Sequence, residues 1–256
     1  MSADPDWLRP DWAASHCEAF MTTRAGGVSR GPYASMNVGS AVHDEPALVA
    51  ENRERVAQAL GAPLVFLNQV HGAAVLRLKP EQALPGAKSY KADAAVSSDP
   101  RVGVAIQVAD CLPVLFAAPR AVGGAHAGWR GLAGGVLENS IAALCEASDC
   151  QPRDIQAWLG ACIGAEAFEV GAEVLQAFGR EPVPGQDADA FAYRPNTAGE
   201  PRWRGDLLRL ARQHLHEAGV SRISGGHWCT VSEPSRFFSY RRERLSGRMV
   251  AAIRLR

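Results

Sequence analysis

The feature that most constrains the fold is a succession of short apolar segments in the middle of the chain. The segments 102–108, 113–118 and 121–125 consist almost entirely of apolar residues, and each has the length of a β-strand. Two earlier segments, 64–70 and 73–78, are apolar or alternate between apolar and polar residues. This pattern predicts a sheet built from the middle of the chain.

Helical patterns precede and follow these segments. A helix is predicted after Asp44, because Pro46 suits a first helical turn and Gly61 suits a C-terminal cap. Further helices are predicted at 132–147, 169–178 and 206–218. The Pro-, Gly- and Asp-rich segment 179–203 predicts a surface loop. We therefore expect an α/β (mixed α+β) fold, with one compact domain over residues 1–256 and a central mixed sheet flanked by helices.

Composition narrows the class of protein. The chain has 256 residues, 47% of them hydrophobic, with 27 basic and 27 acidic residues. A net charge of zero favours neither nucleic acid nor an anionic membrane as a partner. No apolar stretch approaches a membrane span, and the acidic, Pro-containing N-terminus is unlike a signal peptide, so we expect a cytoplasmic protein. Six cysteines show no paired spacing, and we expect no disulfides.

Reactive side chains stand where the predicted strands end. His71 follows one strand in "NQVHG", Cys111 separates two strands in "ADCLPVLF", and His126 precedes a Gly-rich turn in "GGAHAGWRG". Histidine and cysteine are common zinc ligands, and three ligands with an open position are typical of a catalytic site. The three residues therefore predict a His2Cys site.

The two histidines and Cys111 also admit roles other than metal binding. Either histidine can be an ordinary hydrogen-bonded core residue, and without metal Cys111 can be a nucleophile with His126 as its base. Asp93 and Cys162 are candidates for a fourth metal ligand, although neither lies in a ligand-like motif.

Signals for anion binding lie on either side of this cluster. Arg24 precedes Gly26 and Gly27 in "TTRAGGVSRGPYASMNVG", where backbone N–H groups can line an anion nest. Arg130 stands at a predicted helix N-terminus, and Arg241 lies beside aromatic residues in "FFSYRRER". Each signal alone is weak, because Gly-rich turns and exposed arginines are common.

Five strings in order make the whole chain resemble a known family. They are "NQVHG", "ADCLPVLF", "HAGWRGLAGG", "WLGACIGAEAFEVGAEV" and "CTVSEPSRFFSYRRERLSGRM". The chain resembles the laccase-domain family, long labelled polyphenol oxidases and now regarded as zinc-containing purine nucleoside phosphorylases. One departure is "GACIG", with Ala161 and Cys162, where the family commonly has "GPAIG". This departure puts substrate preference in doubt more than activity.

The resemblance implies a fold shared with certain cysteine-hydrolase-like toxins and one metal held by His71, Cys111 and His126. The metal is expected to be zinc, with copper as the other possibility, and the same three residues are the expected catalytic ones. The expected substrates are phosphate and the nucleosides adenosine, inosine, guanosine and methylthioadenosine, with deamination of adenosine as a side activity. We expect a monomer or weak homodimer. The candidate residues for binding nucleoside and phosphate are Arg24, Asn37, Arg130, Tyr240 and Arg241.

Two chemical steps are expected at this site. In phosphorolysis, phosphate held by Arg24 and backbone amides attacks the anomeric carbon as the purine leaves. In deamination, a zinc-bound hydroxide attacks the purine, which requires a proton shuttle. Asp110, next to Cys111, is either that shuttle or a buried structural acid.

Three other functions compete with this expectation. A zinc amidase that edits misincorporated amino acids in peptidoglycan precursors would use the same open metal position. A copper polyphenol oxidase is disfavoured, because a multicopper site needs many histidines and the chain has seven. A non-enzymatic zinc-stabilised binding module is disfavoured, because a structural zinc normally has four protein ligands.

Overall fold

The protein is a mixed α/β structure built around two stacked sheets. The computed structural model describes residues 4–84 and 87–256. The first sheet has four strands in the order β1-β13-β5-β2. These strands are β1 (Cys17–Met21), β13 (Met249–Leu255), β5 (Gly103–Val108) and β2 (Leu64–Phe66). Its strand pairs are both antiparallel and parallel, so the predicted mixed α/β class is confirmed.

The second sheet has six strands in the order β12-β8-β6-β7-β4-β3. These strands are β12 (Arg222–Gly225), β8 (Gln156–Leu159), β6 (Leu112–Ala118), β7 (Ala121–Ala127), β4 (Ala94–Ser97) and β3 (Val75–Arg77). The expected central sheet is thus divided over two layers. The apolar segment 102–108 enters the first sheet and the segments 113–118 and 121–125 enter the second, because the chain crosses between sheets at residues 109–111.

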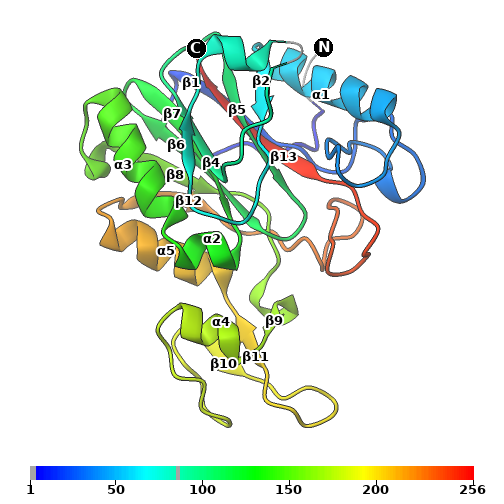
Figure 1. The fold of residues 1–256 in the computed structure, drawn as a ribbon, viewed down its shortest axis with the longest axis vertical. Coiled ribbons are helices and arrows are strands. Elements are labelled where there is room, and N and C mark those ends of the chain that lie inside the picture. Colours follow the sequence, from blue (N-terminus) through cyan, green and yellow to red (C-terminus); the bar gives the residue numbers. More distant parts are fainter. Residues whose placement is uncertain (1–3, 85–86) are drawn as a thin grey trace.

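Helices cover the outer face of each sheet, which gives four layers (Figure 1). Helix α1 (Pro46–Leu60) packs its Val56 and Leu60 on the four-stranded sheet. The six-stranded sheet is covered by α2 (Trp129–Ala133), α3 (Val136–Ser148) and α5 (Leu207–Glu217). Apolar side chains of both sheets, such as Ile106 and Leu115, form a separate core between them.

The helix predictions are confirmed at α1 and α5. Pro46 begins α1, and Gly61 follows it in the left-handed conformation with φ +79°. Asp206 caps α5, with its carboxylate accepting the backbone N–H of Arg209. The single helix predicted at 132–147 is wrong in its first part. Gly135, with φ +86°, turns the chain between α2 and α3, and such a value is readily adopted by glycine.

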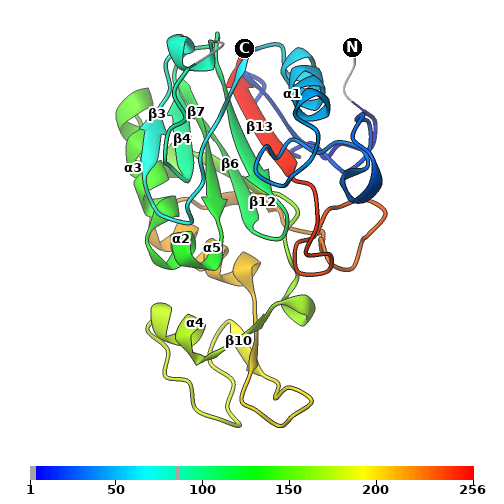
Figure 2. The same cartoon turned by 45° about the vertical axis from the view of Figure 1, so that its right-hand side comes forward.

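A small unit projects from one end of the main body (Figures 1 and 2). It contains β9 (Glu169–Val170), α4 (Ala172–Ala177), β10 (Phe191–Tyr193) and β11 (Trp203–Gly205). The predicted helix 169–178 begins as a strand, and the predicted loop 179–203 contains β10 and the start of β11. Phe191 and Trp203 are buried there, so these two aromatic side chains organise an otherwise polar segment.

In the described part of the chain, the remaining helices are four short 3₁₀ helices. They are η1 (Gly31–Tyr33), η2 (Pro80–Ala83), η3 (Pro152–Asp154) and η4 (Ala165–Ala167). Within residues 4–84 and 87–256, every helix is too short or too polar to cross a lipid bilayer. All six cysteines are free thiols.

Candidate active site

His71 lies on a sharp turn that a buried carboxylate holds. The predicted strands 64–70 and 73–78 are shorter than expected, and the chain between β2 and β3 turns at His71, which has φ +61°. Asp93 accepts the backbone N–H groups of Val70, His71 and Gly72 at 3.1, 2.8 and 2.7 Å. Three successive N–H groups that point to one side form an anion nest, and here the anion is a side chain of the protein.

The same carboxylate orients His126. Asp93 immediately precedes β4, its side chain is fully buried, and one oxygen lies 2.9 Å from Nδ1 of His126 on β7. Burial disfavours the Asp93 carboxylate, but hydrogen bonds from His126, Gly72 and Val70 prevail and lower the pKa of Asp93. An ionised carboxylate at Nδ1 keeps the proton there and leaves Nε2 of His126 as the ligand atom.

Cys111 completes the cluster from the crossing between the two sheets. Its Sγ lies 3.8 Å from Nε2 of His71, and the ligand atoms of His71, Cys111 and His126 all lie within 4.8 Å of one another. A Cβ on Gly128 would lie 2.8 Å from this Sγ, so glycine leaves room for the thiol. In a tetrahedral zinc site, sulfur and nitrogen ligands are about 3.5 Å apart. The donor set and spacing therefore fit a metal ion.

The electrostatics of the cluster favour a thiolate. Burial opposes ionisation of Cys111, but the charge of His126 and hydrogen bonds from His126 and His71 prevail and lower the pKa of Cys111 to about 6. Burial also opposes the charge of His126, but the Cys111 thiolate and the hydrogen bond to Asp93 raise the pKa of His126 to about 9. A thiolate is required both of a metal ligand and of a nucleophile.

Asp110 has a structural role beside this cluster. Its φ of +103° is unusual for a residue with a side chain. One carboxylate oxygen accepts the hydroxyl of Thr230 at 2.6 Å, and the other accepts the backbone N–H of Arg241 at 2.6 Å. Because both oxygens are engaged, the geometry favours the structural acid over the proton shuttle.

The cluster opens into a cavity of about 1090 Å³. One group of lining side chains is apolar or aromatic, and comprises Trp129, Ile163, Phe168 and Leu207. Three of the predicted substrate-binding residues, Arg130, Tyr240 and Arg241, also line it. The guanidinium of Arg130 stacks on Trp129 with its carbon 4.3 Å from the ring centroid. The structure therefore brings these residues and the cluster to one cavity.

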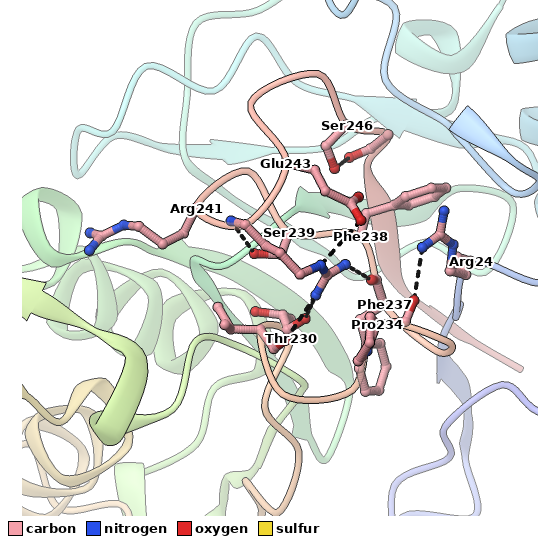
Figure 3. A network of polar contacts seen from close by, with 12 residues as sticks. Arg24, Thr230, Pro234, Phe237, Phe238, Ser239, Arg241, Glu243 and Ser246 are labelled. Carbon is pink, nitrogen blue, oxygen red and sulfur yellow. Dashed lines mark hydrogen bonds and ion pairs between the residues drawn. The ribbon is translucent and has the colours of Figure 1, made fainter. Parts of the chain in front are cut away.

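Arg24 and Asn37 are absent from the lining formed by the described residues. The guanidinium of Arg24 donates to the carbonyls of Ala34 and Pro234 at 3.0 and 2.8 Å. Figure 3 shows it directed at Pro234, whereas Arg241 extends away from this network. Asn37 is buried, and its Oδ1 accepts the backbone N–H of Arg248. Both side chains hold loops together, and their predicted contact with substrate stays a prediction.

Neither predicted fourth ligand extends the cluster. The Asp93 carboxylate is bonded to His126 and to the turn at His71, and Cys162 is buried with its thiol directed at the carbonyl of Ile163. Two cavity-lining residues, Arg53 and Arg248, were missed by sequence reasoning. Arg53 lies inside a helix and Arg248 just before a strand, so neither carries a local motif for binding.

These observations define a mixed α/β protein with a candidate metal centre at the ends of its strands. Residues 18–256 match the family described as multi-copper polyphenol oxidoreductase laccase. The chain therefore belongs to this family, and the predicted laccase-domain resemblance is confirmed.

Relatives of known name cover almost the whole chain. The purine nucleoside phosphorylase YfiH of Escherichia coli is 44% identical over 97% of this chain and 96% of its own length. A purine nucleoside phosphorylase of Pseudomonas aeruginosa is 42% identical over 96% of this chain and 97% of its own length. The crystal structure of a Neisseria meningitidis protein shares 45% identity and a TM-score of 0.86, with 98% of this chain and 99% of that chain covered.

Proposed function

We propose that this protein is a purine nucleoside phosphorylase with a zinc ion at His71, Cys111 and His126. The observation that carries the proposal is one cavity that joins this cluster to aromatic and to cationic side chains. The names of the full-length bacterial relatives support the same activity. The proposed substrates are phosphate with adenosine, inosine, guanosine or methylthioadenosine.

The proposed reaction exchanges one bond at the anomeric carbon. A phosphate oxygen forms a bond to C1′ of the pentose, and the C1′–N9 bond breaks with its electron pair leaving on the purine. The purine takes up a proton from phosphate or solvent, and the products are the free base and a pentose 1-phosphate. Such a reaction depends on the placement of the two substrates and on stabilisation of charge.

The chain offers a surface for each substrate. Trp129, Ile163, Phe168 and Leu207 present flat or apolar groups that suit a purine ring. Positively charged side chains on the same cavity suit phosphate, because a guanidinium donates paired hydrogen bonds to an oxyanion.

The cluster fits zinc by the chemistry of its donors. Two imidazoles and one thiolate are ligands that zinc accepts, and the carboxylate of Asp93 orients His126 as outer partners of zinc ligands commonly do. When bound, zinc would supply a Lewis acid toward an oxygen of the substrate or of water. We also propose adenosine deamination as a side activity, because a zinc ion held by these three protein ligands would have a coordination position open to water.

The test is chromatography of the products that metal-quantified protein forms from adenosine, with and without phosphate. Adenine that appears with phosphate and not without it supports the phosphorylase. Inosine in both reactions supports deamination. Loss of adenine formation after chelation, and its return with Zn²⁺, distinguishes the metal from a Cys111 nucleophile. If zinc-loaded protein forms neither product, the proposal is wrong, and a muramyl-serine nucleotide becomes the next substrate for the amidase alternative.

A further inference from the structure

Two partly buried arginines on the cavity wall have no carboxylate of the described residues in direct contact with their guanidinium groups. Arg53 on α1 and Arg248, just before β13, both line the cavity. Neither forms an ion pair with any residue in 4–84 or 87–256. Partly buried guanidinium groups without a carboxylate are costly, so their presence in a cavity indicates an anionic ligand.

Neutral groups hold Arg53 in place and leave donors free. Its Nε donates to the carbonyl of Val38 at 2.8 Å, and its guanidinium carbon lies 4.1 Å from the ring centroid of Phe66. Its Nη2 makes longer contacts, at 3.3 Å to the hydroxyl of Ser40 and at 3.5 Å to the side-chain oxygen of Gln107. The stacked and anchored group is therefore preorganised, and among the described residues its Nη1 has no hydrogen-bond partner.

Arg248 is anchored in a similar way. Its Nη1 donates to the carbonyls of Ser246 and Gly247 at 2.9 and 3.0 Å. The buried Asn37 accepts its backbone N–H at 2.8 Å, and its carbonyl accepts the N–H of Val38 at 3.1 Å. Among the described residues, Nε and Nη2 of Arg248 have no hydrogen-bond partner.

The segment 38–40 contacts both arginines. Val38 bonds to the side chain of Arg53 through its carbonyl and to the backbone of Arg248 through its N–H. A Cβ on Gly39 would lie 2.7 Å from Cγ of Arg248, so glycine permits this close approach. Ser40 contacts Arg53 and also lines the cavity. Burial lowers the pKa of both arginines, that of Arg53 to about 10, so both stay charged at neutral pH.

We infer that Arg53, Arg248 and the hydroxyl of Ser40 form the subsite for the oxyanion of inorganic phosphate in this cavity. This inference rests on the proposed function for its choice of free phosphate as the ligand. Two anchored guanidinium groups and one hydroxyl on the wall of the same cavity suit a tetrahedral dianion, because guanidinium N–H groups donate charge-assisted hydrogen bonds to phosphate oxygens. Arg24, which the sequence indicated for phosphate, is absent from the described lining of this cavity.

The first test measures binding of inorganic phosphate to zinc-loaded protein by calorimetry, without nucleoside. Arg53→Gln and Arg248→Gln are each expected to weaken phosphate binding by about 10-fold to 100-fold, the effect of losing a charge-assisted hydrogen bond. Arg53→Lys is expected to restore part of the affinity. The matched control is Arg55→Gln on the same helix, because Arg55 pairs with Glu51 on the outer surface. Circular dichroism of each variant establishes that it is folded.

The second test separates the subsite from the proposed function. With adenosine and phosphate as substrates, both Gln variants are expected to raise the KM for phosphate at least 10-fold and to change the KM for adenosine by less than about threefold. If phosphate binding depends on both arginines but no adenine forms, the subsite stands and the phosphorylase proposal fails. If uridine diphosphate binds here and free phosphate does not, the ligand is the phosphate of a larger substrate and our assignment is overturned. Unchanged phosphate binding in both folded Gln variants overturns the subsite itself.

Discussion

The two polar regions of the cavity are built on opposite principles. The cluster of His71, Cys111 and His126 is held by a buried negative charge, since Asp93 bonds to His126 and to the backbone at His71. The region of Arg53 and Arg248 is held by neutral carbonyls. A carboxylate beside an imidazole fixes its tautomer, whereas a carboxylate beside a guanidinium would compete with an anionic ligand. The difference shows which charges the protein satisfies by itself and which it leaves for substrates.

The largest expected effect on zinc binding and activity comes from replacing the thiol of Cys111. Cys111→Ser is expected to lower bound zinc and to reduce adenine formation by more than about 100-fold, which exceeds the usual effect of losing an outer partner of a metal ligand. Metal analysis and product chromatography measure both changes. Cys145→Ser, a free thiol on α3, is the matched control and is expected to keep full activity. If Cys111→Ser unfolds the protein, the centre is structural and not catalytic.

The second prediction tests the buried carboxylate. Asp93→Ala is expected to reduce zinc affinity by about 10-fold to 100-fold. It should also lower the free energy of unfolding by about 3 kcal/mol, because His126 and three backbone N–H groups lose their acceptor. Zinc titration and urea denaturation measure these changes. Asp149→Asn, an exposed helix cap, is the control. Equal zinc affinity in Asp93→Ala would show that the cluster is not held by this charge.

A third prediction concerns Asp110, the acidic residue next to Cys111. Asp110→Ala is expected to lower the free energy of unfolding by about 2 kcal/mol, through loss of the bonds to Thr230 and Arg241. Asp110→Gly should cost less, because glycine adopts a φ of +103° without strain. Thr230→Val removes one of the two bonds and should have an intermediate effect. An Asp110→Gly variant less stable than Asp110→Ala would contradict this explanation.

The smallest effect lies far from the cavity, between α3 and α5. A hydrogen bond to Glu138 raises the pKa of His214, and despite burial the same bond lowers the pKa of Glu138. The stabilisation by His214 is present below its unfolded pKa of about 6.5 and is lost as pH rises through its folded pKa. The stabilisation by Glu138 is present above its unfolded pKa of about 4.3 and is lost as pH falls through its folded pKa.

The pair should therefore stabilise the protein most between about pH 4.5 and 6.5. His214→Gln is expected to cost about 0.5 kcal/mol in this window and less at pH 8, because both side chains are partly exposed. Thermal unfolding at pH 5.5 and pH 8 measures the difference. A cost that is larger at pH 8 would show that the pair is not ionic.

Local patterns predicted the elements that depend on local forces. Helix α1 has its Pro and Gly signals at both ends, and α5 has one apolar face, so both were recognised. The break at Gly135 was missed, because the apolar pattern continues across it. Strands β10 and β11 were missed, because two buried aromatic residues outweigh a polar composition that is typical of loops.

The candidate site was predictable in its chemistry and not in its full membership. His71, Cys111 and His126 stand out because reactive residues interrupt apolar strands, and the structure brings them together. Arg24 looked like an anion-binding residue because glycines follow it, yet its Nε and Nη1 bond to Ala34 and Pro234 and it is absent from the described lining of the cavity. A Gly-rich neighbourhood does not show whether a guanidinium is free.

The sequence by itself therefore determined the strand segments, two helices and the residues of the metal-type cluster, because spacing and residue type act over a few positions. Only the tertiary structure decided that Arg53 and Arg248 line the cavity and that Arg24 is absent from its described lining. Strand β13 pairs with β5 so that Met249 lies opposite Val108, which brings Arg248 toward the crossing that carries Cys111. Such pairing depends on long-range backbone hydrogen bonds and on the core between the sheets, and no local pattern records it.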